Sequence, residues 1–198
     1  MSSKNEILGR LRKNVREVYD MPDLNFEKLT FADPVAEYIK QTTTTAGAKL
    51  IEVKAGDDLN ELIRQAYPQA KVITSNVPGI KADRNPDTVE CAQDLDGTDV
   101  GVIQGTIACA ENACVWVPMD MKQKAVCFIS EFLVLIVSRK SIVSNMHQAY
   151  KALEAMGDNS SKYGFGTWMS GPSKTADIEQ SLVYGAQAAC GLTVLLTD

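Results

Sequence analysis

The sequence has only one histidine and lacks any long apolar run. Its longest such run, 132–137, is far short of the roughly 20 residues that a membrane-spanning helix needs. The opening residues, MSSKNEILGR, lack the apolar segment of a signal peptide. We therefore expect a cytoplasmic protein without membrane association. His147 falls on an expected helix, where we expect a packing or surface role, and no Ser–His–Asp triad can be specified.

An excess of positive charge is also missing. The 198-residue chain carries 20 basic and 25 acidic side chains, for a formal net charge of −5. A protein that collects nucleic acid or anionic lipid by general electrostatic attraction needs the opposite balance. We therefore expect no nucleic-acid partner.

The five cysteines form no C-x-x-C pair, and their number is odd. Both features argue against a disulfide framework and against a zinc or iron–sulfur cage. Cys109 and Cys114 lie five residues apart, so on one continuous strand they would face opposite sides and share no ligand. The sequence thus favours buried thiols acting as small apolar side chains, with no metal site.

Hydrophobic periodicity predicts one α/β domain over 1–198, with helices in 1–47 and the α/β core in 48–198. Strands at 49–53 and 71–75 flank a helix that Asp58 can cap. Such crossovers join parallel strands, so we expect a three-layer α/β sheet with an N-terminal helical segment. Further strands are expected at 100–110, 114–117, 125–129, 132–137, 164–169 and 192–196.

Three further helices are expected. The first carries an apolar stripe that we expect to face the core, although its basic residues would also suit an acidic partner. Its stripe comprises Ile7, Leu8, Leu11, Val15 and Val18. The second has Asp33 as cap, Pro34 at its first position and Gly47 as stop. The third ends at Gly157.

The segment GPSKTADIEQ (171–180) is expected between a strand and a helix carrying Ile178, Leu182 and Ala186. Such a turn can bind an anion, since free N–H groups and the helix dipole converge there and Lys174 adds a positive charge. Ser173 and Thr175 can instead cap the helix. From the residues alone the two interpretations are equally supported. Glu111, at a turn between strands, is a candidate catalytic group or an ordinary exposed glutamate.

The segments 171–196 and 99–117 together resemble the LUD domain family, that of lactate utilization protein C, and the GPS-[KR]-TADIE element is the specific part. The resemblance covers most of the chain. It implies the fold shared by glucosamine-6-phosphate deaminases, ribose-5-phosphate isomerases and CoA transferases. Positions matching the motif are Gly171, Pro172, Ser173, Lys174, Thr175, Asp177 and Glu179.

Three loops depart from the family pattern. Glu111 matches the first residue of a Glu-Thr-Gly-Thr segment, which continues here as Asn112, Ala113 and Cys114. The family's His-Gly-Pro is replaced by 187–189, which begins with Gln187, and its Pro and His before the central strand are replaced around 130–133. The resemblance places Gln187 beside the motif as a further ligand-binding candidate.

The resemblance implies an accessory, non-redox subunit of a system that oxidises L-lactate to pyruvate. It would bind a small carboxylate or phosphorylated ligand at the Ser173–Thr175 turn. No cofactor is expected in this chain, and iron–sulfur clusters are expected in two partner proteins. The alternatives are a stand-alone enzyme acting on a sugar phosphate or CoA thioester, with Glu111 as nucleophile or base, and a degenerate module with a structural role.

Overall fold

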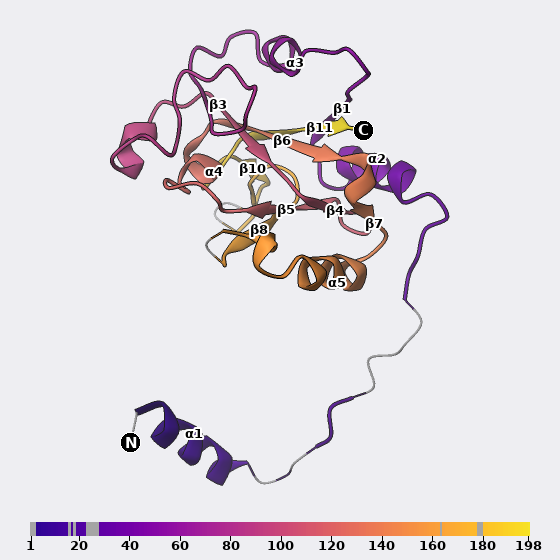
Figure 1. The fold of residues 1–198 in the computed structure, drawn as a ribbon, viewed down its shortest axis with the longest axis vertical. Helices are drawn as coiled ribbons and strands as arrows, with labels where there is room; N and C mark the ends of the chain where they lie inside the picture. The colour runs from indigo at the N-terminus through magenta and orange to yellow at the C-terminus, as the bar shows by residue number, and fades with distance from the viewer. Residues whose placement is uncertain (1–2, 16, 18, 23–27, 163, 178–179) are drawn as a thin grey trace.

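A five-stranded parallel sheet forms the centre of the computed structural model, which describes residues 3–15, 17, 19–22, 28–162, 164–177 and 180–198 (Figure 1). Its strands, in spatial order, are β1 (Lys49–Glu52), β11 (Gly191–Thr197), β6 (Phe132–Ser138), β3 (Val100–Gln104) and β2 (Ile73–Ser75). Every neighbouring pair runs parallel. The expected mixed α/β fold with a parallel sheet is confirmed.

Strands β6 and β11 occupy interior positions of the sheet because their side chains are apolar on both faces. Five consecutive residues of β6, 133–137, are buried, and Leu133 pairs in register with Leu192 of β11. A strand whose side chains are apolar on both faces is stable only where both faces are covered by other parts of the protein. The apolar runs at 132–137 and 192–196 predicted these strands correctly.

Helix α3 (Leu59–Ala66) covers one face of the parallel sheet. The Asp58 carboxylate caps it by accepting from the N–H of Asn60 at 2.8 Å. Ile63 then packs against Val100 and Val134. The predicted strand–helix–strand unit is present, but β1 and β2 lie at opposite edges of the sheet, so the connection crosses its full width.

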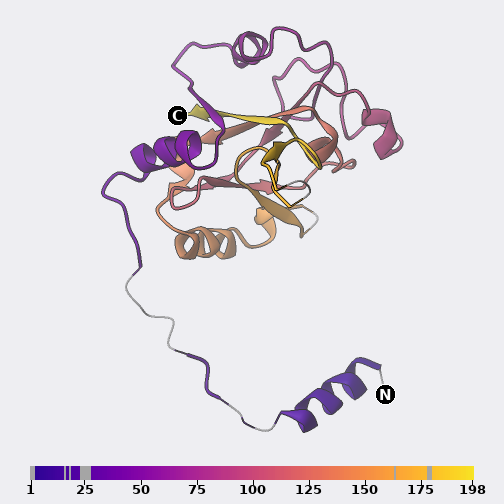
Figure 2. The same cartoon turned by 180° about the vertical axis from the view of Figure 1, so that it is seen from behind.

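A second sheet covers the other face, and this differs from the expected three layers. Its strands, in spatial order, are β7 (Ile142–Val143), β4 (Ile107–Cys109), β5 (Cys114–Pro118) and β8 (Gly166–Met169). Ala108 and Val115 face the parallel sheet, whereas Ile107 faces helix α5 (Met146–Met156), which covers the outer side (Figure 2). The order is therefore helix, parallel sheet, second sheet, helix.

The single strand expected over 100–110 is in fact two strands in different sheets. The Gly105 N–H donates to the carbonyl of Ile136 in the parallel sheet, and the next N–H, of Thr106, donates to Trp116 in the second. A Cβ on Gly105 would overlap the Val115 side chain. The glycine lets the backbone pass close to the neighbouring strand as it changes sheets.

Helix α2 (Pro34–Thr44) begins and ends where the sequence predicts. The Asp33 carboxylate accepts from the N–H of Ala36 at 3.0 Å, and Pro34 is the first helical residue. Gly47, with φ +70°, turns the chain out of the helix towards β1. Tyr38 is fully buried between α2 and the core.

Helix α1 (Ser3–Asn14) does not bury its apolar stripe, contrary to the expected core-facing role. Ile7 and Leu11 are each 57% exposed, and Val15 is 56% exposed. Both views show the helix away from the sheets (Figures 1 and 2). Helical periodicity identified the amphipathic helix correctly, but it carries no information about what the apolar face contacts. Val18 lies outside the described residues.

Two further expectations are wrong. Residues 125–129 contain the short helix α4 (Val126–Ile129), because the N–H of Ile129 bonds to the carbonyl of Ala125 instead of to a neighbouring strand. The expected helix after residue 175 is replaced by a ribbon of β9 (Lys174–Thr175) and β10 (Val183–Tyr184). Three 3-10 segments complete the described elements: Ala92–Leu95, Arg139–Ser141 and Gly157–Ser160. No helix in the described parts is long and apolar enough to cross a membrane.

Candidate functional site

The turn at 171–175 leaves β8 and packs at the amino-terminal edge of the parallel sheet. The N–H of Ser173 donates to the carbonyl of Ala189, two residues before β11 begins. The N–H of Gly185 donates back to the carbonyl of Ser173, so backbone groups pair across the ribbon and not along a helix. Leu182 and Ala186 are therefore not helical, and Ile178 and Glu179 lie outside the described residues.

Gly171 fits its position because the backbone there is left-handed and closely packed. Its φ is +71°, and a Cβ would overlap the carbonyl oxygen of Ala46. Any other residue would strain the backbone and collide with the chain leaving α2. Pro172 beside it is buried. The start of the motif is thus fixed against the segment that joins α2 to β1.

The ammonium group of Lys174 is bound at the carboxyl end of α2. Its Nζ lies 2.6 Å from the carbonyl oxygen of Ala46 and 3.2 Å from that of Thr45. These carbonyls follow the last turn of the helix, where the dipole is negative and a cation is stabilising. Lys174 therefore ties the motif to α2, a contact that the sequence did not reveal.

Glu111 lies at the turn between β4 and β5, with its carboxylate directed at helix α5. Its Oε2 accepts from the N–H of Met146, the first residue of α5, at 2.9 Å. The same turn is hydrogen-bonded to the residue just before the motif, since Ser170 Oγ donates to the carbonyl of Asn112 at 2.7 Å. The structure thus brings together the two loops of the family resemblance, while the exposed Glu111 side chain supports α5.

The remaining candidates lie at the surface. Asp177 and Gln187 are exposed, and Gln187 precedes Ala188 and Ala189, which line a cavity with the motif. His147 is exposed on α5. Among the described side chains no group of three His, Cys, Asp or Glu is placed to hold a metal ion.

The expectation about Cys109 and Cys114 is wrong. They do not lie on one continuous strand but on β4 and β5, directly opposite each other across the hairpin. Directly opposed residues of an antiparallel pair point to the same face. Both side chains are buried beneath α5, together with Met146 and Ala149.

Three adjoining cavities run along the amino-terminal edge of the parallel sheet. A cavity of about 210 Å³ is lined by Gly171, Pro172 and Ser173. It shares Pro172 and Leu192 with a second, of about 320 Å³, which shares Lys49, Tyr67 and Phe132 with a third, of about 330 Å³. We call this row of cavities the edge cleft.

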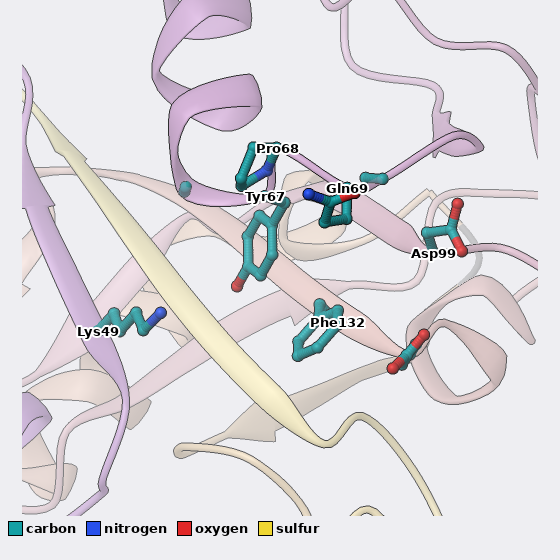
Figure 3. Close-up of a pocket in the computed structure, with 9 residues that line it drawn as sticks. Lys49, Tyr67, Pro68, Gln69, Asp99 and Phe132 are labelled. Atoms are coloured by element: carbon teal, nitrogen blue, oxygen red, sulfur yellow. The ribbon is translucent and has the colours of Figure 1, made fainter.

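Two aromatic side chains, Tyr67 and Phe132, line two of the three cavities of the edge cleft, one of which is drawn in Figure 3. The rings of Tyr67 and Phe132 lie 5.0 Å apart, and the Tyr67 hydroxyl is 2.7 Å from Thr193 Oγ1. Burial raises the pKa of Tyr67, so its hydroxyl remains a neutral hydrogen-bonding group. Lys49 extends towards the cleft from β1, and Asp99 and Glu131 line its other end.

Sequence reasoning missed Lys49, Tyr67 and Phe132 as site residues. Lys49 and Phe132 stand at the first positions of expected strands, and Tyr67 follows an expected helix. A sequence read element by element does not show that the amino ends of β1, β6 and β11 lie side by side. The order of strands was the missing information.

The chain is a mixed α/β protein with a five-stranded parallel sheet, a second sheet against it and the GPSKT turn beside the amino ends of the parallel strands. The family model "LUD domain" matches residues 36–197. The chain therefore belongs to the LUD domain family.

Two curated relatives are each called lactate utilization protein C. The protein of Shouchella clausii is 26% identical over 122 residues, which is 61% of this chain and 53% of the relative. That of Macrococcus caseolyticus is 25% identical over 183 residues, 84% of this chain and 79% of the relative. The chain thus spans about half the length of one relative and about four fifths of the other.

A solved structure supports the fold. The crystal structure of a DUF162 family protein from Deinococcus radiodurans superposes with a TM-score of 0.65 and covers 86% of this chain and all of that one. The two sequences are 18% identical, so this likeness concerns the fold alone.

Proposed function

We propose that this protein is an accessory, non-redox subunit of a cytoplasmic system that oxidises L-lactate to pyruvate. The proposal is supported by membership of the LUD domain family and by similarity to two proteins named for lactate utilization. Iron–sulfur proteins are its proposed partners, and the redox centres belong to them. This chain would supply binding and positioning.

The proposed ligand is a small carboxylate or phosphorylated anion bound at the motif turn and extending into the edge cleft. Ser173 lines the cavity at the turn, and Lys49 lines the adjoining one, so a hydroxyl donor and an ammonium group border connected space. Lys174 holds the turn in place through α2, which makes it a positioning residue in this proposal. Gly171, Pro172, Thr175, Asp177 and Gln187 remain its other proposed ligand-binding residues.

Reconstitution tests the role in lactate oxidation. The tagged chain is purified gently from its native cells, and the eluate is examined for partner proteins by mass spectrometry, for iron, and for lactate-dependent dye reduction. We expect iron-containing partners together with lactate oxidation. If a complex reconstituted without this chain oxidises lactate at the full rate, the proposal is wrong.

Titration calorimetry tests the ligand site separately. L-lactate, pyruvate and a sugar phosphate are titrated into the parent protein and into Lys49→Ala and Lys40→Ala. Lys40 is an exposed lysine of α2 paired with Glu37, so it matches the charge change away from the cleft. We expect Lys49→Ala to weaken binding by tenfold or more, about 1.4 kcal/mol, and Lys40→Ala to leave it unchanged. Equal affinities in all three proteins would contradict the site.

A second candidate function is a structural module in which the motif only maintains the fold. The observation that favours it is that two of the charged candidates bond at helix ends: Lys174 at the end of α2 and Glu111 at the start of α5. Under this alternative, Glu111→Gln lowers stability but leaves complex activity unchanged. A folded Glu111→Gln complex without lactate oxidation would instead assign Glu111 a catalytic role.

A further inference from the structure

Three sulfur atoms meet between β4, β5 and the first turn of α5. Cys109 and Cys114 are directly opposed in the hairpin and are only 0% and 3% exposed. The Cys114 Sγ lies 3.4 Å from the Sδ of Met146. Met146 is half-buried, and its flexible thioether adjoins the Cys114 thiol. Two thiols and a thioether therefore form one cluster.

One end of a helix lies beside the cluster. Met146 is also the first residue of α5, so the positive end of the helix dipole lies at the cluster. A negatively charged sulfur at this place is therefore stabilised by the helix end beside it.

The donor set selects the kind of ion. Zinc and iron–sulfur centres take three or four thiolate, imidazole or carboxylate ligands, and the described residues offer no such group. Thiolate and thioether sulfur together suit a monovalent soft ion, Cu(I). With bonds of about 2.3 Å, the length of a zinc–thiolate bond, one ion could contact both Cys114 Sγ and Met146 Sδ, which lie 3.4 Å apart.

We propose that Cys109, Cys114 and Met146 form a three-sulfur binding site for Cu(I). On binding, both thiols release their protons to solvent and two Cu–thiolate bonds form, with the Met146 thioether as third donor. Copper keeps its +1 state and no electron is transferred. The site lies between the outer face of the second sheet and α5, and none of its three residues lines the edge cleft.

A second cysteine–methionine pair in the chain serves as a comparison for the proposed site. Cys127 lies 3.7 Å from the Sδ of Met119 and is also buried, but this pair has only one thiol. A second thiol opposite the first is what distinguishes the proposed site. Cys91 and Cys190 are exposed and would bind Cu(I) adventitiously, so the test uses a Cys91→Ser/Cys190→Ser background.

The first test measures stoichiometry and affinity. The reduced background protein is mixed anaerobically with Cu(I), and the chelator bathocuproine disulfonate competes for the ion. We expect one Cu(I) per chain, lost on adding Cys109→Ser or Cys114→Ser and unchanged on adding Cys127→Ala. Circular dichroism verifies that each variant is folded. Undiminished binding without either cysteine, or no uptake by the folded reduced protein, would overturn the proposal.

The second test identifies the atoms bound to copper and does not depend on a cysteine variant. X-ray absorption of the Cu(I)-loaded background protein should show three sulfur neighbours at about 2.3 Å. Met146→Leu conserves side-chain volume, so it should fold. It should show two sulfur neighbours and bind Cu(I) more weakly, by about tenfold. Oxygen or nitrogen neighbours in the parent, or the same sulfur count in Met146→Leu, would show that the assignment is wrong.

Discussion

Ala113 has a backbone conformation that suits glycine. Its φ is +55°, in the left-handed region, at the position where the LUD pattern has the glycine of its Glu-Thr-Gly-Thr segment. A non-glycine residue there is strained by roughly 1–2 kcal/mol. The side chain is also buried at 4% exposure, so removing its methyl group costs about 0.8 kcal/mol. The two effects oppose each other in a glycine variant.

We therefore predict that Ala113→Gly changes the free energy of unfolding by less than about 0.5 kcal/mol, since relief of strain offsets lost burial and lost chain stiffness. Ala110→Gly is the matched control, because Ala110 is fully buried in the same turn and its φ is not positive. It should destabilise by about 1.5 kcal/mol. Urea denaturation compares them, and equal losses would show that residue 113 is unstrained.

The Asp99 carboxylate binds the chain just before β2 and makes the stability of the protein depend on pH. Its Oδ2 accepts from the N–H groups of Lys71 and Val72, at 2.7 and 2.8 Å. The bonds from Val72 and then Lys71 lower the pKa of this carboxyl group. A lowered pKa in the folded state gives stability that is present above the unfolded pKa, about 3.9, and is lost as the pH falls through the lower folded value.

Asp99→Asn should accordingly destabilise by about 1 kcal/mol at pH 7, and the difference from the parent should shrink below about pH 4. Denaturant titrations between pH 7 and pH 3 measure it. Glu61→Gln removes an exposed carboxylate of α3 and should remain within about 0.5 kcal/mol of the parent at pH 7. A constant difference down to pH 3 would refute the role of the charge.

At the scale of elements, Lys174 fastens the β9–β10 ribbon to α2. We predict that Lys174→Met lowers the free energy of unfolding by about 1 kcal/mol, because the carbonyls of Thr45 and Ala46 lose a charged donor. Lys40→Met on the same helix should cost less than about 0.5 kcal/mol, since its pair with Glu37 is exposed. Thermal unfolding of both variants measures this difference. Equal effects would leave Lys174 without an anchoring role.

Sequence patterns predicted elements where local chemistry decides them. Asp33 and Pro34 set the start of α2, and the apolar run of β6 requires burial on both faces. The sequence patterns failed where contacts with a segment distant in the sequence determine the secondary structure. The stretch after Thr175 has helical spacing at Leu182 and Ala186, but pairing across the ribbon and Gly185, which packs on Cys190, override it.

The candidate site was predicted only in part for the same reason. The motif turn was located correctly along the chain, but Gly171 and Lys174 contact the end of α2, more than a hundred residues away. The cysteine pair was misjudged because it was considered on one continuous strand, although the turn predicted at Glu111 places Cys109 and Cys114 on the two strands of a hairpin. Contacts between distant segments are not encoded in local spacing.

At the scale of the whole molecule, strand order gathers the amino ends of β1, β11 and β6 at one edge, and the motif turn closes over them. Ligands of open α/β sheets ordinarily bind at the carboxyl ends of the strands. Here a cavity of about 290 Å³ lies at that end, lined by Asn76 and Gln104. The motif residues lie at the opposite edge, so the LUD motif and the usual ligand edge are separated in this fold.

Removing the N-terminal helix would show whether the α/β core needs it for its stability. Helix α1 buries none of its residues, so removing residues 1–22 should shift the melting temperature by less than about 2 °C. The segment from Leu29 should be kept, because its carbonyl accepts from Asn145 Nδ2 at 2.6 Å and the N–H of Phe31 donates to Ser144 Oγ. Differential scanning calorimetry of the shortened and full chains measures the shift. A drop of more than about 4 °C would mean that the apolar stripe with Ile7 and Leu11 packs on the core in solution, as the sequence predicted. An unchanged melting temperature would show that this stripe has no role in the stability of the α/β core.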